Sequence, residues 1–284
     1  MSDGGPSIIE ISDPDDPRLE CFRNVRDKDL RGRDRLFLAE SEMVVQRLIE
    51  RTAPLEALLL SPAAVQRMSG VLAQLNATVP VYQLDLEGMC DVAGFHIHRG
   101  VLAAGRRPEA RATSVDQLIG DLQGRSTLRL LIGESITNID NMGGLFRTGA
   151  AFSVDGIVLD PTCCDPLYRK SIRVSMGHVF SVPWAISSDW PGDLRRLRES
   201  LGLHVVAAET TDGARPLWTL EHHDRLAMVV GSEAHGIAPA TLNACDETLE
   251  IPMAPGVPSL NVATAASVFL YEAQRHIANA CNTP

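Results

Sequence analysis

The second half of this 284-residue sequence contains, at residues 226–236, the stretch LAMVVGSEAHG. Its first five residues are apolar and have the length of a buried strand, and a polar loop with a glycine at each end follows at once. The same succession of apolar run, loop and helical pattern repeats from residue 128 to the C-terminus. This alternation predicts an α/β fold with a parallel sheet and helices on both faces. Ligands of such sheets bind beside the carboxyl ends of strands, so the loops at those ends are where chemistry is expected.

The first hundred residues form a separate pattern of alternating helical and extended stretches. One helix is expected to open at Ser61-Pro62, a cap residue followed by proline, and to run to about Asn76. Another strand is expected at 96–102. Residues 106–127 are rich in Gly, Arg, Pro, Ala, Thr and Ser, as linkers are, with a short helix expected at 115–122. We therefore predict a small α/β module at 1–105, a linker at 106–127 and a larger domain at 128–284.

Composition excludes several classes of protein. The sequence has no apolar run of 18 residues, and its acidic, glycine-rich N-terminus does not resemble a secretory signal. The six cysteines include no CxxC pair, which indicates reduced thiols and a cytoplasmic protein without a membrane segment. No metal site is expected, because none of the Cys and His pairs has the spacing of a zinc site. These pairs are Cys163-Cys164, His96 with His98, and His222-His223.

The charge of the sequence is a weaker guide to binding partners than its composition is to the class of protein. The 26 basic and 36 acidic side chains leave a net charge of −10, which argues against indiscriminate coating of nucleic acid but leaves room for a local basic surface. All but two of the cations are arginine, whose planar fork suits phosphate oxygens, although codon bias would produce the same excess. Two basic stretches are candidates for contact with nucleic-acid phosphates, and a solvated helix face explains the second one almost as well. The residues are Arg23, Arg26, Arg31 and Arg33 in the first stretch, and Arg169, Lys170 and Arg173 in the second.

The loop NIDNMGG at residues 138–144 leads into a helical pattern that carries Arg147. Asparagine and glycine there can cap a helix and allow a tight turn. Arg147 lies among apolar residues, and burying an arginine is costly unless an anion or a hydrogen-bond partner awaits it. Two interpretations remain open, an ion-paired core arginine and a contact to phosphate or substrate.

Two more loops follow strands. The loop at 231–236 lacks the Lys-Ser/Thr of a P-loop, and no G-x-G-x-x-G follows a strand, so the main signatures of nucleotide hydrolysis and dinucleotide binding are missing. After Ile251-Pro252-Met253 and a Pro/Gly-rich loop, SLNVA at 259–263 opens the last helix. Ser259 alone would serve as an N-cap, but Asn261 in an otherwise apolar first turn suggests a functional role.

Together the three loops resemble the three motifs of the SpoU (TrmH-like) branch of the SPOUT RNA methyltransferases. The first motif is matched by Asn141, Gly143 and Arg147. The second is matched by Gly231, Glu233 and Gly236, with Ser232 in place of the usual asparagine. The third is matched by residues 259–262, with Ala263 in place of the last serine. The resemblance covers about residues 128–280, and residues 1–105 resemble, more faintly, the ribosomal-protein-like module of many members.

The resemblance implies a catalytic domain folded into a deep trefoil knot, an RNA-binding N-terminal module and a homodimer. It implies S-adenosylmethionine as cofactor and a ribose 2′-hydroxyl, the group that distinguishes RNA from DNA, as methyl acceptor. The catalytic residues that it implies are Arg147, Asn141, Glu233, Ser259 and Asn261. The cofactor-binding residues that it implies are Gly231, Ser232, Gly236, Ile251, Met253 and Leu260.

The RNA substrate stays open between ribosomal and transfer RNA. The N-terminal module modestly favours ribosomal RNA, and neither DNA nor a membrane is expected as a partner. One alternative is a methyltransferase that acts on a base or on a ribose of the tRNA anticodon loop. The other is a non-catalytic RNA-binding or ribosome-assembly protein on the same fold, against which the joint presence of Asn141, Arg147, Glu233 and Asn261 argues.

Overall fold

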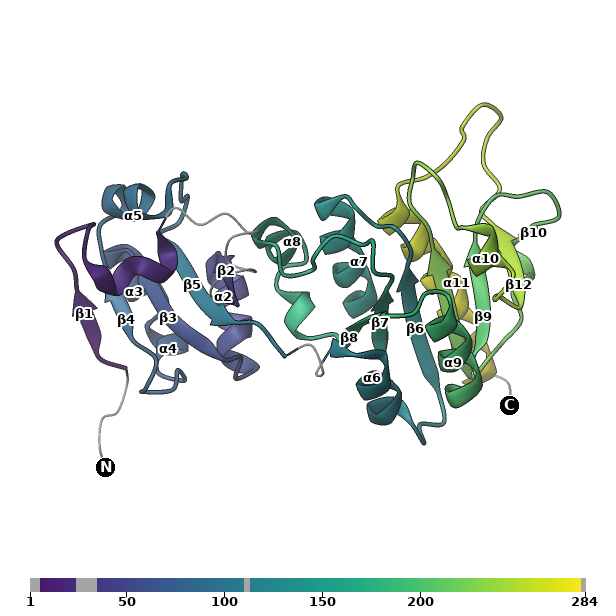
Figure 1. Ribbon diagram of the computed structural model, residues 1–284, viewed down its shortest axis with the longest axis horizontal. Coiled ribbons are helices and arrows are strands. Elements are labelled where there is room, and N and C mark those ends of the chain that lie inside the picture. Colours follow the sequence, from purple (N-terminus) through teal and green to yellow (C-terminus); the bar gives the residue numbers. More distant parts are fainter. Residues whose placement is uncertain (1–5, 24–34, 110–112, 282–284) are drawn as a thin grey trace. The chain divides into compact units, whose positions relative to one another are not determined.

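The structure is a computed structural model that describes residues 6–23, 35–109 and 113–281. The chain divides into two compact units. The first comprises residues 1–107 together with 167–180, and the second comprises residues 108–166 together with 181–284. Figure 1 labels the helices and strands of both units.

The first unit contains a mixed five-stranded sheet with the strand order β1-β4-β3-β5-β2, in which β5 runs antiparallel to both of its neighbours. Its strands are β1 (Ile8–Glu10), β2 (Leu36–Glu40), β3 (Leu55–Leu60), β4 (Val81–Gln83) and β5 (Val101–Arg106). Its helices are η1 (Pro17–Phe22), α2 (Glu42–Glu50), α3 (Pro62–Arg67), α4 (Ser69–Leu72), α5 (Leu86–Ala93), α8 (Arg169–Val174) and η4 (His178–Phe180).

Two expected elements of this unit differ from the structure. Ser61 does cap a helix, since its hydroxyl accepts a hydrogen bond from the Ala64 amide at 3.2 Å, but that helix ends at Arg67 and a second short helix follows. Met68 at the break has φ −96° and ψ 8°, outside the helical region. The strand expected at 96–102 begins only at Val101, because Gly100 adopts a left-handed conformation (φ +65°) that a strand cannot contain.

The segment 167–180 packs in the first unit although the sequence pattern assigns it to the larger domain. The guanidinium groups of Arg169 and Arg173 both pair with the carboxylate of Glu40 in β2, at 3.3 Å for Arg169. The Arg169 guanidinium also lies 3.5 Å from the centre of the Phe95 ring, a cation–π contact. These contacts between residues far apart in sequence hold the segment against the first sheet.

The second unit contains a seven-stranded sheet with the order β10-β12-β9-β11-β6-β7-β8, in which every neighbouring pair is parallel. The predicted parallel α/β sheet is therefore confirmed. Its strands are β6 (Leu128–Gly133), β7 (Gly156–Leu159), β8 (Trp184–Ile186), β9 (His204–Ala208), β10 (Arg215–Pro216), β11 (Arg225–Val230) and β12 (Glu247–Glu250). Its helices are α6 (Val115–Leu122), α7 (Ile139–Ala151), α9 (Gly192–Leu201), η5 (Leu217–Thr219), α10 (Pro239–Leu242) and α11 (Val262–Cys281).

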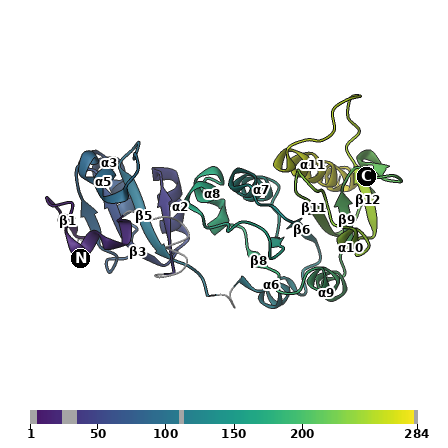
Figure 2. The ribbon, with the colours of Figure 1, turned by 45° about the horizontal axis from the view of Figure 1, so that its top comes forward.

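Helices cover both faces of this sheet, as Figure 2 shows with α6, α9 and α10 on one side and α7 and α11 on the other. Alternate residues of β6, β9 and β11 pack with α6 and α9 in one apolar core. Helix α6 falls within the stretch 106–127 that composition suggests as a linker. Its residues Val115, Leu118 and Leu122 are buried in that core, so the helix is part of the second unit.

On the opposite face α7 and α11 approach closely. A Cβ atom at Gly144 of α7 would lie 2.8 Å from the Cβ of Ala263 in α11, so only glycine fits at this crossing. One turn further along, the hydroxyls of Thr148 and Ser267 lie 3.1 Å apart and hydrogen-bond. Among the described residues, no helix is long and apolar enough to cross a membrane.

Candidate functional site

A pocket of about 340 Å³ lies at the carboxyl ends of β9, β11 and β12, at the edge of the sheet where the chain topology predicts a ligand. Its walls come from the loops that follow these strands and from the start of α11. The lining residues are Ala208, Glu209, Thr210, Val230, Gly231, Ser232, Glu233, Gly236, Glu250, Ile251, Met253, Pro258, Ser259, Leu260, Val262, Ala265 and Phe269. The six residues that sequence predicts to bind a cofactor are all among them, and so are Glu233 and Ser259.

The loop after β11 owes its shape to two glycines. A Cβ atom on Gly231 would lie 2.3 Å from the carbonyl carbon of Gly236, so a side chain there would collide with backbone. Gly236 has φ +64°, and a Cβ atom on it would lie 2.3 Å from Glu209 Oε2. The loop closes on itself through a hydrogen bond from the Gly236 amide to the Ser232 carbonyl at 2.9 Å. The glycines thus bring backbone, rather than side chains, to the wall of the pocket.

Asn261 connects all three motif loops. Its amide nitrogen donates to Asn141 Oδ1 at 2.7 Å and to Glu233 Oε1 at 2.9 Å. Its amide oxygen accepts from the backbone of Ala263 at 3.0 Å and Thr264 at 3.3 Å, which makes Asn261 the N-cap of α11. The expectation that Ser259 could cap this helix is therefore wrong, because α11 begins three residues later at Val262.

Asn141 and Arg147 lie in the same helix but in different surroundings. Asn138 caps α7 by accepting from the Asp140 amide at 2.8 Å, and Asn141 in the first turn is buried beside Asn261. Arg147 is exposed and makes no hydrogen bond or ion pair with any residue that the structure describes, Asn141 and Glu233 included. Arg147 lies six positions after Asn141, and that step turns the helix by about 240° beyond one full turn, onto another face. Of the two interpretations left open, the ion-paired core arginine is wrong.

Two glutamates at this edge have no counterpart among the candidates from sequence. Glu209 directly follows β9, and its Oε2 accepts from the Ile237 amide at 2.7 Å, which ties the loop after β11 to the loop after β9. Glu250 ends β12 and also lines the pocket. With Glu233 they give the lining three carboxylates, and among the described residues that line the pocket there is no lysine, arginine or histidine. The rule that places ligands at strand ends could have found both residues.

The candidate RNA-contact residues are placed less uniformly. Arg23 forms ion pairs with Asp15 at 3.1 Å and with Glu20 at 3.5 Å. Arg169 and Arg173 both form ion pairs with the carboxylate of Glu40. Lys170 is exposed. Arg26, Arg31 and Arg33 lie outside the described residues. Among the described candidates, the three arginines are thus paired with carboxylates and Lys170 is exposed.

Comparison with known proteins places a family match in the second half of the chain. Residues 129–271, half of the chain, match the model of the SpoU rRNA Methylase family. The chain belongs to this family. Its departures from the family motifs lie at Ser232, which lines the pocket, and at Ala263, which packs on Gly144.

Relatives of this SpoU family chain extend beyond the matched region. An uncharacterized tRNA/rRNA methyltransferase of Mycobacterium bovis is 40% identical over 95% of the chain and 93% of its own length. The 23S rRNA (guanosine-2′-O-)-methyltransferase RlmB of Acinetobacter baylyi is 29% identical over 69% of the chain and 79% of its own length. In fold, the chain is similar to an AdoMet-bound rRNA methyltransferase from Sinorhizobium meliloti, with a TM-score of 0.80, 21% identity, and 95% and 98% of the two chains covered.

Proposed function

We propose that this protein transfers a methyl group from S-adenosylmethionine to a ribose 2′-hydroxyl of RNA, with ribosomal RNA as the favoured substrate. The observation that carries the proposal is the hydrogen-bonded series Asn141–Asn261–Glu233, of which Glu233 lines the pocket. It joins the three motif loops of a SpoU family member, although 120 positions of sequence separate Asn141 from Asn261. Membership of the family supports methyl transfer to RNA, and the relationship to RlmB supports the ribose hydroxyl and ribosomal RNA.

The residues of the pocket fit S-adenosylmethionine. Its volume of about 340 Å³ lies in the range of small-molecule sites, and apolar side chains such as Ile251, Leu260 and Phe269 suit an adenine ring. Backbone at Gly231 can approach a ligand closely. The three carboxylates favour a cofactor that bears positive sulfonium and ammonium groups, and they disfavour a phosphorylated nucleotide. The cofactor would lie against Gly231, Ser232, Gly236, Ile251, Met253 and Leu260.

S-adenosylmethionine supplies an electrophilic methyl group. A ribose hydroxyl attacks poorly until its proton is removed, so the protein must help that proton to leave. Arg147 cannot act as the base, since a guanidinium does not lose its proton in proteins. We propose that exposed Arg147 binds the neighbouring RNA phosphate with its fork and stabilises the developing alkoxide, while the proton leaves through the phosphate or water.

Asn141, Asn261, Glu233 and Ser259 position the reacting groups in this proposal. Asn261 holds the start of α11 against the first turn of α7, and therefore fixes the helix that presents Arg147. Glu233 accepts a hydrogen bond from Asn261 and also lines the pocket, so it connects the proposed cofactor site with the start of α11. Ser259 on the same wall can hydrogen-bond cofactor or ribose.

Several further properties implied by the resemblance belong to the proposal. They are a trefoil knot in the second unit, a homodimer, a cytoplasmic location and RNA binding by a ribosomal-protein-like first unit. Arg23, Arg26, Arg31, Arg33, Arg169, Lys170 and Arg173 are the basic residues proposed to contact RNA. A methyltransferase acting on a base or on the tRNA anticodon loop remains the alternative substrate assignment.

The experiment that tests the proposal uses methyl-labelled S-adenosylmethionine and total RNA from cells lacking the protein. The wild-type chain is compared with Arg147→Lys, which keeps the charge and loses the fork. Arg195→Lys is the matched control, because Arg195 is an exposed arginine of α9 away from the pocket. Cofactor affinity is measured separately by calorimetry, and the RNA is digested to nucleosides.

We expect label in a 2′-O-methylnucleoside, a rate at least about a hundredfold lower for Arg147→Lys with unchanged cofactor affinity, and a normal rate for the control. Near-native activity of Arg147→Lys would overturn the role of Arg147. Label in a methylated base would select the alternative reaction. Cofactor binding without label would direct the search to an assembled ribosomal particle, and absence of both would favour a non-catalytic RNA-binding protein.

A further inference from the structure

A second group of chemically active side chains lies at the opposite edge of the second sheet. His204 begins β9 and Glu247 begins β12, and His223 lies two residues before β11. Strands β12, β9 and β11 are neighbours and parallel, so their amino ends meet at one edge. The pocket proposed for the cofactor lies at their carboxyl ends. The group is therefore separate from the site described above.

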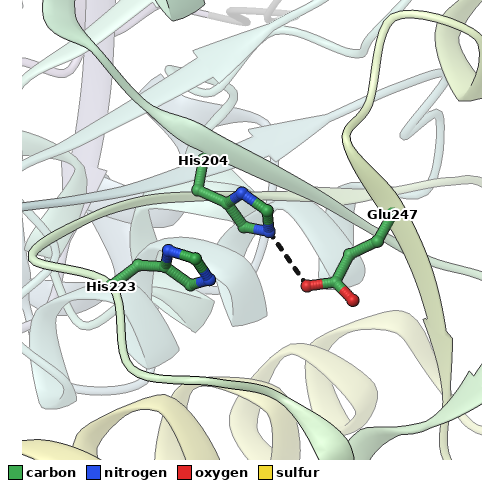
Figure 3. A group of neighbouring side chains, drawn as sticks. All are labelled: His204, His223 and Glu247. Atoms are coloured by element: carbon green, nitrogen blue, oxygen red, sulfur yellow. Dashed lines mark hydrogen bonds and ion pairs between the residues drawn. The ribbon is translucent and has the colours of Figure 1, made fainter.

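The three side chains point toward one another, as Figure 3 shows. One ligand-type atom from each lies within 4.8 Å of the other two, and His204 Nε2 is 2.9 Å from Glu247 Oε1. Two ligand atoms bound to a tetrahedral zinc ion at 2.0–2.1 Å are about 3.4 Å apart. The His204–Glu247 pair therefore has to open slightly, and the stacked His223 ring has to turn before its nitrogen points at the same ion. All three residues are half-buried, which leaves them within reach of an ion from solvent.

We propose that His204, His223 and Glu247 bind a divalent transition-metal ion of the zinc class, which ties together the amino ends of β9, β11 and β12. Two imidazoles and one carboxylate form a ligand set that binds such ions in preference to magnesium or calcium. Water would complete the coordination, since the part of the chain that the structure describes offers three ligands here. The site does not depend on the proposed methyl transfer.

One side chain has to turn for the ion to bind. The rings of His204 and His223 stack with their centres 3.7 Å apart and their planes at 7°, so their in-plane lone pairs run parallel and do not converge. The His223 ring makes no hydrogen bond with any described residue, so rotation about its side-chain bonds breaks the stacking contact with His204 and no such hydrogen bond.

Neighbouring charges are compatible with this arrangement. Arg215 pairs with the other carboxylate oxygen of Glu247, Oε2, and leaves Oε1 facing His204. Coordination through His204 Nε2 places the ring proton on Nδ1, which is 3.9 Å from Asp246 Oδ2. Asp246 in turn pairs with Arg198, so no isolated carboxylate is added to the site.

The test is a zinc titration of the full chain after removal of metals with a chelator, read by competition with a chromophoric zinc indicator. Variants His223→Gln and Glu247→Gln each remove one ligand. His222→Gln is the matched control, because that imidazole is adjacent in sequence but pairs with Asp224 at 3.2 Å. Co²⁺ spectra report whether nitrogen and oxygen, or thiolate, ligate the ion, and circular dichroism verifies that each variant folds.

We expect one zinc ion per chain, an affinity at least about tenfold weaker in both ligand variants, and no change in the control. The thermal midpoint should rise with zinc in the wild-type chain and not in His223→Gln. Equal zinc affinity in folded His223→Gln and His222→Gln, a thiolate signature with Co²⁺, or no zinc binding by the wild-type chain would overturn the proposal. None of these measurements uses methyl transfer, so failure here leaves the proposed function untouched.

Discussion

Replacing Asn261 by aspartate is the sharpest perturbation that the structure offers. Aspartate has the same shape and keeps the oxygen that caps α11 at Ala263 and Thr264. It replaces the amide donor that serves Asn141 and Glu233 with an acceptor. The helix cap therefore survives, and only the connection between the motif loops is lost.

The size of the effect follows from burial. Asn141 is only 8% exposed, and its Oδ1 loses its one described donor, which costs about 1–3 kcal/mol for an unsatisfied buried acceptor. Glu233 is exposed, so repulsion between its carboxylate and the new one adds under about 1 kcal/mol after solvent screening. We expect the free energy of unfolding to fall by about 2–3 kcal/mol at pH 7, and cofactor affinity to fall as the pocket wall loosens.

The assay is urea denaturation followed by circular dichroism, with Asn243→Asp as control. Asn243 is an exposed asparagine after α10 whose replacement adds the same charge, and we expect a change within about 0.5 kcal/mol. A double-mutant cycle with Asn141→Ala isolates the Asn141–Asn261 term, expected at about 1 kcal/mol. Strict additivity in that cycle, or a stable Asn261→Asp, would refute the reasoning that this hydrogen bond holds the motif loops together.

Two further predictions concern glycines and thiols. Gly231→Ala should push the loop after β11 away from Gly236 and weaken cofactor binding at least about tenfold. The control Gly120→Ala lies exposed in α6, where no atom is within 4 Å of the new methyl group, and should stabilise the fold by about 0.5–1 kcal/mol. Equal cofactor affinities of Gly231→Ala and the wild-type chain, measured by calorimetry, would contradict the first expectation. Burial, helped by a neighbouring aspartate, raises the pKa of Cys164 to about 11 and that of Cys245 to about 12 from an ordinary 9.0. In the unfolded chain these thiols ionise at lower pH than in the folded chain, so the free energy of unfolding should decline as pH rises from 9 to 11. The urea midpoint should decline less over this range in a Cys164→Ala/Cys245→Ala variant than in the wild-type chain. Equal declines of the two midpoints would contradict the contribution of these thiols.

The local sequence pattern was sufficient to predict much of the second unit. The apolar run at 226–230 predicted β11 (Arg225–Val230) to within a residue, because buried parallel strands consist of continuous apolar residues. The rule that ligands bind at strand ends located the pocket, since chain direction alone decides which loops share that edge. The rule applies equally to Glu209 and Glu250, which motif spacing did not mark.

Burial could not be predicted so directly. Arg147 lies among apolar neighbours in sequence and is nevertheless exposed, because its direction depends on which face of α7 meets α11. Likewise the segment 167–180 follows β7 in sequence but packs in the first unit through Glu40 and Phe95. Neither outcome is a property of the local sequence.

The sequence by itself determined the parallel α/β fold and the order of the motif loops, because these depend on hydrophobic period and on the order of residues along the chain. Only the tertiary structure decided that Asn261 joins Asn141 to Glu233, and that His204, His223 and Glu247 meet. Those contacts join residues 19 to 120 positions apart, and strand order and helix crossing bring them together. A pattern that repeats every two or 3.6 residues carries no information on distances of that kind.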